Sequence, residues 1–130
     1  MTSWMAAPSA GAILADLGAD VIKVEPPRGD PLRGISRQPK VPEGEPNIDA
    51  ALNVDNRGKR SVAVAVDKPA GAEVVKRLIA EADVLLTNLL AHRQARYGFD
   101  PESLREVNPG LVHATLTGYG LDGPDAVSYT

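Results

Sequence analysis

The chain has 130 residues, a length that suits one domain, and its 43% hydrophobic and 24% charged residues are typical of globular proteins. A formal net charge of −3 excludes the overall basic character of a nucleic-acid-binding domain, and zero cysteines exclude disulfides, thiolate metal sites and a cysteine nucleophile. The two histidines lack metal-ligand spacing. No apolar run reaches the ~20 residues of a membrane helix, and no signal peptide is evident. We therefore expect a cytoplasmic protein without a metal.

The first 60 residues predict one helix, one strand and a long loop. Pro8 suits the start of the helix and Gly18 its end. Its apolar face recurs at helical spacing and consists of Ala10, Ile13, Leu14 and Leu17. Residues 21–24 are rich in β-branched side chains and predict a buried strand that ends at Glu25. From 26 to 60 the periodicity is lost, so we expect a long irregular loop there.

The remaining residues alternate between strand and helix patterns. We expect strands at Ser61–Val66, Asp83–Thr87 and Leu111–Thr117, a helix beginning at Pro69, and a short helix with Asp100 as its N-cap. Strands that alternate with helices predict a parallel α/β sheet with helices on its faces. Ligands of such sheets bind beyond the carboxyl ends of the strands. Asn88 follows the strand that ends at Thr87, which makes it a candidate ligand contact.

Three other features carry weaker signals. Gly118–Gly123 matches G-x-G-x-x-G, but Pro124 follows and no helix pattern begins there, so we interpret it as a glycine-rich turn. His113 sits within a strand pattern and favours a satisfied structural role, whereas His92 favours the surface. The run Asn56–Ser61 holds three cations before a strand. It fits either a solvated turn or a set of phosphate contacts, and both readings remain open.

Three segments taken together resemble one known family. They are PSAGAILADLGADVIKVEPPRGDPLRG (residues 8–34), NRGKRSVAV (56–64) and ADVLLTNLLAHRQARYGFDPESLREVNPGLVHATLTGYGLDGP (82–124). In this order and spacing they resemble family III CoA-transferases of the CaiB/BaiF type, which include formyl-CoA transferases and share their fold with α-methylacyl-CoA racemases. The resemblance covers nearly the whole chain. It implies a Rossmann-like large domain, to which residues 1–130 would contribute a part, with 26–60 as a loop inside it.

The resemblance also implies a reaction. In the family, an aspartate carboxylate attacks an acyl-CoA thioester to give a mixed anhydride, and the released CoA thiolate attacks that anhydride. The aspartyl-CoA thioester then passes CoA to a carboxylate acceptor, so catalysis is covalent and nucleophilic. Coenzyme A is thus a substrate, and its partners are an acyl-CoA and a carboxylate. Two alternatives stay open: a truncated remnant without catalysis, and part of a racemase-like isomerase that removes an α-proton.

The resemblance assigns CoA contacts residue by residue. Asn88 and Leu89 match the strand-end pair that contacts CoA, Arg96 matches an arginine that serves its phosphates, and Val64 matches an apolar position beside the adenine. The chain departs from the family at two cations. Pro26 replaces an arginine, with Arg28 two residues away, and Asp67 replaces a lysine, with Lys68 beside it. An aspartate facing a phosphate adds repulsion, so Arg28 and Lys68 are the candidate substitutes.

Family members are about three times longer than this chain and form interlocked homodimers. By comparison with them, the sequence predicts that the first strand of the sheet, the small domain and the catalytic aspartate are missing, the last lying just beyond Thr130. A sheet without its first strand exposes apolar strand edges, and such edges recruit other chains. We therefore expect an incomplete Rossmann-like sheet, no catalytic residue within the chain, and self-association.

Overall fold

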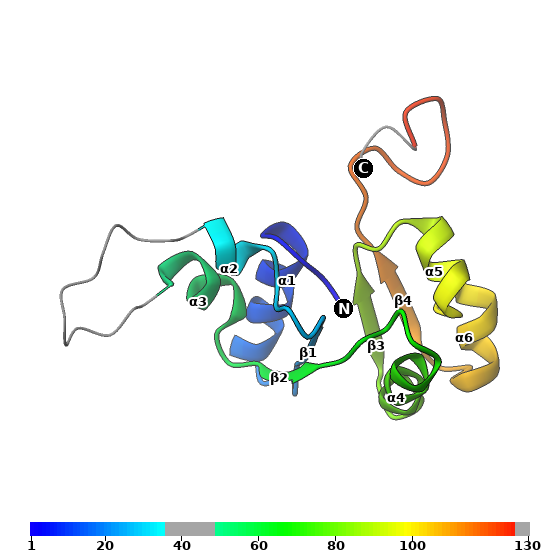
Figure 1. Ribbon diagram of the computed structural model, residues 1–130, viewed down its shortest axis with the longest axis horizontal. Helices are drawn as coiled ribbons and strands as arrows, with labels where there is room; N and C mark the ends of the chain where they lie inside the picture. The colour runs from blue at the N-terminus through cyan, green and yellow to red at the C-terminus, as the bar shows by residue number, and fades with distance from the viewer. Residues whose placement is uncertain (36–48, 127–130) are drawn as a thin grey trace. The chain divides into compact units, whose positions relative to one another are not determined.

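The computed structural model describes residues 1–35 and 49–126, and Figure 1 shows its helices and strands. The chain divides into two compact units. One comprises Ser3–Ala63 and is called the N-terminal unit; the other comprises Met1–Thr2 with Val64–Thr130 and is called the C-terminal unit. Each unit holds a two-stranded parallel sheet with helices beside it, so the predicted α/β class is confirmed.

The N-terminal unit contains α1 (Ala6–Asp16), β1 (Ile22–Glu25), α2 (Leu32–Ile35), α3 (Ala50–Asn56) and β2 (Arg60–Ala63). β1 pairs with β2 in parallel, with Val24 opposite Val62. The prediction of irregular structure over 26–60 is wrong at α2 and α3, and residues 36–48 lie outside the described part. α3 forms because Asp49 caps it: the carboxylate accepts a hydrogen bond from the Leu52 main-chain N–H at 2.9 Å.

The buried face of α1 differs from the predicted one. The residues that α1 buries are small, namely Ala7, Pro8, Gly11 and Ala12. Ile13, Leu14 and Leu17 are 54%, 42% and 79% exposed, so the predicted apolar face is not the packed face within this unit. Small side chains let α1 approach α3 closely. This close packing, and not the spacing of the large apolar residues, determines which face of α1 is buried.

A buried ionic cluster fixes the chain after β1. Glu25 accepts a forked pair of hydrogen bonds from Arg33, one from the Ser61 hydroxyl at 2.7 Å, and one from the Asp30 main-chain N–H at 2.9 Å. Lys23 donates to Asp30 at 2.6 Å, and both side chains are buried. The Arg33 guanidinium is the main reason that the pKa of Glu25 falls to about 2. The cluster therefore holds a charged carboxylate at neutral pH.

The cations of the Asn56–Ser61 run serve the fold of this unit. Arg57 pairs with Asp16 and Arg60 with Asp20, while the Lys59 ammonium donates to the carbonyls of Pro8 and Asp55. These contacts join the turn before β2 to the two ends of α1 and to the segment leading into β1. They account for all three cations, and the exposed pairs of Arg57 and Arg60 agree with the solvated turn among the two readings that the sequence left open.

Replacing Glu25 with Gln tests the ionic cluster. The folded-state pKa of Glu25 lies below its ordinary value of 4.5, so its stabilisation is fully present above pH 4.5 and is lost as pH falls toward 2. We expect Glu25→Gln to lower the free energy of unfolding by about 2 kcal/mol at pH 7. The difference from the parent chain should shrink between pH 4.5 and 2 in urea unfolding. A difference independent of pH would contradict this account.

The C-terminal unit contains α4 (Pro69–Ala80), β3 (Val84–Thr87), α5 (Ala91–Tyr97), α6 (Pro101–Val107) and β4 (Val112–Thr115). β3 pairs with β4 in parallel, with Leu85 opposite His113 (Figure 1). α4 packs against α6, and the core of the unit is formed by Val64, Val75, Ile79, Leu85, Phe99 and Leu104. The predicted strands and the helices from Pro69 and Asp100 are confirmed with shorter strands, whereas α5 was not predicted. Asp100 caps α6 by accepting from the Ser103 main-chain N–H at 3.0 Å.

Gly71 sets how closely α4 approaches the loop before it. A Cβ placed on Gly71 would lie 2.0 Å from the carbonyl oxygen of Ala65 and 3.2 Å from Cγ1 of Val64. No side chain fits in that space, because the nearest obstacle is backbone and cannot rotate away. The glycine therefore lets the first turn of α4 lie directly on the segment that leaves β2, with Val64 buried beneath it.

Gly71→Ala should move α4 or destabilise the unit. We expect a loss of about 3 kcal/mol in unfolding free energy, the size typical of severe overpacking. Gly110→Ala is the matched control, since its added Cβ meets nothing closer than the Asn108 side-chain oxygen at 3.6 Å. Thermal unfolding of both variants measures the effect, and equal melting temperatures would refute the close approach.

Candidate functional site

The turn between β3 and α5 is held by two buried polar side chains. Thr87, the last residue of β3, accepts a hydrogen bond from the Leu89 main-chain N–H at 3.1 Å, and Gln94 in α5 donates to the Leu89 carbonyl at 2.6 Å. Thr87 and Gln94 are 0% and 3% exposed. The main-chain N–H of Leu89 is therefore engaged, and its carbonyl already accepts one hydrogen bond.

A cavity of about 500 Å³ lies between α4 and the carboxyl end of α5, within the C-terminal unit. The loop before α4 and one face of α4 form one wall, and the last turn of α5 forms the other. Its lining residues are Val66, Asp67, Lys68, Pro69, Ala72, Glu73, Lys76, Ala95, Arg96, Tyr97 and Gly98. The cavity is open to solvent on one side, and three cationic side chains border it.

The cations of this cavity are weakly paired or unpaired. The Lys68 ammonium lies 4.0 Å from the Asp67 carboxylate, and both side chains are largely exposed. In the described part of the chain, no carboxylate lies within 4.0 Å of Lys76 or Arg96. Unlike Arg57 and Arg60, these two cations are thus available to an anion from solution.

The first turn of α4 adds positive polarity at the same place. Lys68 is its N-cap residue and offers no side-chain acceptor, and Pro69 follows at the first helical position. The main-chain N–H groups of an uncapped first turn carry partial positive charge and favour an anion. A cation at the N-cap is unfavourable by itself, and a bound anion would relieve that repulsion.

The structure brings together only some of the predicted contact residues. Lys68 and Arg96 line the same cavity, although they are far apart in sequence. Asn88 and Leu89 lie in the turn after β3 and do not line it, and Val64 is buried below α4 with 8% exposure. Arg28 is exposed in the N-terminal unit, after β1, so its position is described only within that unit.

Sequence reasoning missed Lys76 as a cavity residue. Its ammonium nitrogen lies 3.0 Å from where a Cβ of Gly98 would be, and Gly98 ends α5 in the left-handed conformation with φ of 68°. The signal that could have found it is the helical spacing of Ala72 and Lys76, four residues apart on one face of α4. The end of α5 lies beside this face of α4 because of tertiary packing, which the local sequence does not reveal.

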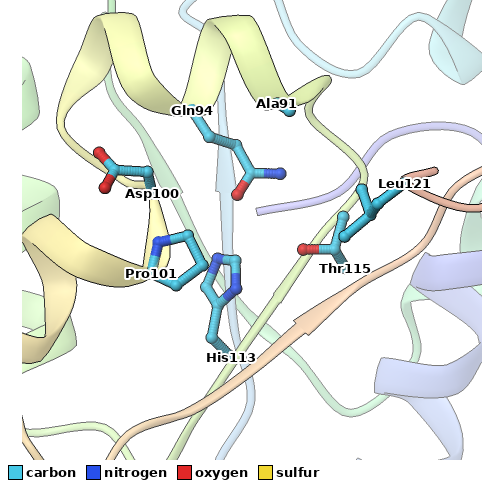
Figure 2. Close-up of a pocket in the computed structure, with 7 residues that line it drawn as sticks. All are labelled: Ala91, Gln94, Asp100, Pro101, His113, Thr115 and Leu121. Atoms are coloured by element: carbon cyan, nitrogen blue, oxygen red, sulfur yellow. The ribbon is translucent and has the colours of Figure 1, made fainter. Parts of the chain in front are cut away.

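A second, smaller pocket of about 290 Å³ lies beside β4. Figure 2 shows the side chains of Gln94, His113 and Thr115 pointing toward one another across it. Burial lowers the pKa of His113, whose ring interacts with the main chain of Phe99. Its Nε2 is buried and has no hydrogen-bond partner among the residues described. The sequence predicted a structural histidine whose ring nitrogens are both hydrogen-bonded, and this nitrogen does not meet that expectation.

The remaining sequence features fall on the surface or in turns. His92 is exposed on α5, in agreement with the predicted surface position. Gly120 and Gly123 adopt φ of 93° and 102° in a turn region, and no helix follows them up to residue 126. Over the two described ranges, no group of three or more acidic or histidine side chains could hold a metal ion. In those ranges, too, every helix is too short or too polar to cross a membrane.

Comparison with known proteins identifies the family. The model of CoA-transferase family III matches residues 1–129. The succinate–glutarate CoA-transferase of Agrobacterium fabrum is 45% identical over 125 residues, which are 94% of this chain and 31% of that protein. The cinnamoyl-CoA:phenyllactate CoA-transferase of Clostridium sporogenes is 38% identical over 96% of this chain and 30% of that protein.

Solved structures agree with the sequence relatives. A crystal structure of a CaiB/BaiF family protein from Brucella suis matches with a TM-score of 0.82 and 42% identity, over 97% of this chain and 33% of that one. The Rv3272 protein of Mycobacterium tuberculosis matches with a TM-score of 0.83 and 36% identity. The chain therefore spans about a third or less of the length of these relatives and corresponds to their N-terminal portion. With the family model matching nearly every residue, this chain belongs to CoA-transferase family III.

Proposed function

We propose that this chain binds the phosphate groups of coenzyme A for a family III CoA-transferase. The observation that carries the proposal is the shared cavity of Lys68 and Arg96. The family resemblance assigns Arg96 to the CoA phosphates and offers Lys68 as the substitute for a lysine that Asp67 replaces, and both residues line this cavity between α4 and α5. An exposed, unpaired arginine that borders a cavity suits phosphate, because its fork of N–H groups matches two phosphate oxygens.

The charge balance of the cavity fits an anion of moderate affinity. Lys68, Lys76 and Arg96 supply three positive charges, and Asp67 and Glu73 supply two negative ones. The N-terminal end of α4 adds partial positive charge, while the carboxyl end of α5 subtracts some. The net attraction is small and solvent-exposed, so binding should weaken with salt, whose Debye length is about 8 Å at physiological ionic strength.

Three further residues of the C-terminal unit belong to the proposed CoA site. Asn88 and the Leu89 side chain would border the path of the CoA arm beyond the carboxyl end of β3, where parallel sheets bind ligands. Val64 would support the adenine from below α4, through the small part of it that is exposed. Arg28, which the sequence proposes as a substitute cation, lies in the loop after β1 of the N-terminal unit, a loop that the Glu25 cluster holds in shape.

The reaction proposed for the longer protein is transfer of CoA from an acyl-CoA to a carboxylate. The relatives named above are a succinate–glutarate CoA-transferase and a cinnamoyl-CoA:phenyllactate CoA-transferase, and these names favour CoA transfer over racemisation. The part proposed for residues 1–130 is to hold and orient the CoA moiety. Positioning of this kind supports the reaction because it holds the thioester beside the attacking group.

Replacing Arg96 tests the site. We expect Arg96→Ala to weaken CoA binding roughly three- to ten-fold at low salt, because it removes a charge-assisted contact at an exposed position. Isothermal titration calorimetry of CoA into the 130-residue chain measures the change. The loss should shrink in 0.5 M salt.

Arg93→Ala is the matched control. Arg93 lies on the same helix, is also exposed, and does not line the cavity. Arg93→Ala removes the same charge as Arg96→Ala, so comparing the two variants separates a local contact from the effect of the overall charge of the chain. Equal affinities of the Arg96 and Arg93 variants would remove Arg96 from the site, and an unmodified chain that binds no CoA would refute the proposed function.

A further inference from the structure

We propose that Lys76 is a phosphate-binding residue of this chain and the main partner of Arg96 in the cavity between α4 and α5. The inference rests on the proposed function and adds a residue that neither the resemblance nor the comparisons assign. Lys76 stands in the third turn of α4, across the cavity from the end of α5. The two side chains that would clamp the anion thus come from two different helices.

Lys76 has no ion-pair or hydrogen-bond partner among the described residues, and the tip of its side chain lies beside the carboxyl end of α5, which carries partial negative charge. The side chain is half-buried, yet the described residues place neither a carboxylate within 4.0 Å nor a hydrogen-bond acceptor at its ammonium. At the end of α5 the carbonyl of Ala95 accepts from Gly98 N–H at 3.2 Å and that of Gln94 from Phe99 N–H at 2.8 Å, and the described hydrogen bonds include none from Lys76 to either. The Lys76 ammonium nitrogen is not among the buried polar atoms that lack a partner in the described residues, so it reaches solvent and is open to an anion.

Gly98 makes room for this ammonium. Because the residue has no Cβ, the Lys76 nitrogen can lie 3.0 Å from the position that a Cβ would occupy. The lysine is therefore held over the end of α5 in place of extending freely into solvent. A positioned cation loses less side-chain entropy on binding than a free one, which favours its use in a binding site.

Lys68 is the weaker alternative for the same role. Its ammonium lies 4.0 Å from the Asp67 carboxylate, and the Lys68 side chain is 73% exposed. Asp67 stands where the family resemblance expects a lysine, so the loop before α4 brings one negative and one positive charge that largely offset each other. Glu73 precedes Lys76 by one turn on the same wall, and Lys76 is the cation of this wall that has no carboxylate within 4.0 Å among the described residues. We therefore assign to Lys76 the attraction that the loop itself does not supply.

The test compares variants of Lys76 in CoA binding to the 130-residue chain. Lys76→Met, which keeps the stem but removes the charge, should weaken CoA binding about five-fold in 50 mM salt and less than two-fold in 0.5 M salt. Lys76→Arg should keep most of the affinity. Arg77→Met is the matched control, since Arg77 is the next residue on α4, exposed and outside the cavity, and it should bind as the parent does.

A second ligand and a stability measurement separate the possible outcomes. Adenosine 3′,5′-bisphosphate carries phosphates without the pantetheine arm, and Lys76→Met should weaken its binding by a similar factor. If Arg96→Ala weakens CoA binding and Lys76→Met does not, the role of Lys76 is refuted while the proposed function stands. A Lys76→Met variant with a lower melting temperature and an affinity loss that ignores salt would show a structural role and overturn the inference. A parent chain without CoA affinity overturns both.

Discussion

The close approach of α4 to the segment that leaves β2 is the constraint on which the candidate site depends. At Gly71 only a hydrogen fits between the helix and the Ala65 carbonyl, and this contact fixes where the helix begins. The start of α4 in turn fixes the positions of Lys68 and of the residues one and two turns later. On the other side of the cavity, Thr87 and Gln94 fix the turn into α5, and so the place of Arg96. The cavity is the space that these two rigid connections leave between them.

The two units use their charges in different ways. In the N-terminal unit the cations in and around β1 and β2 form ion pairs within the unit, such as the Glu25–Arg33 fork and the Lys23–Asp30 pair. In the C-terminal unit the cavity cations Lys76 and Arg96 have no such partners within the described residues, and Lys68 has Asp67 at 4.0 Å. A buried pair must be complete to be tolerated, whereas an exposed cation costs little when unpaired. A cation without an ion-pair partner beside a cavity is thus a better sign of a ligand site than the number of cations in a sequence motif. The Asn56–Ser61 run has three cations, and all three have ion-pair or hydrogen-bond partners within the N-terminal unit.

The sequence predicted those elements whose signals are local. Asp100 and Pro69 are helix-start signals that act within one turn, and β-branched residues mark the strands at 22–25 and 84–87. It failed where tertiary packing decides. The apolar residues Ile13 and Leu14 predicted the wrong buried face of α1, because small residues opposite them permit tighter packing with α3. Lys68 and Arg96 could be selected only through the family resemblance, and no local pattern could join them to Lys76, since their meeting depends on how α4 and α5 pack.

An anion that contacts both Lys76 and Arg96 would also bind α4 to α5. In the described structure α4 packs chiefly against α6, and the end of α5 meets α4 across an open cavity. A phosphate held by both helices would add a contact present only in the folded chain. Such a ligand stabilises the fold by mass action, by about 2.7 kcal/mol when its free concentration is a hundred times Kd. Coenzyme A would then also stabilise this unit, because its phosphates would offset the positive charges of Lys76 and Arg96 and would join α4 to the end of α5 across the cavity.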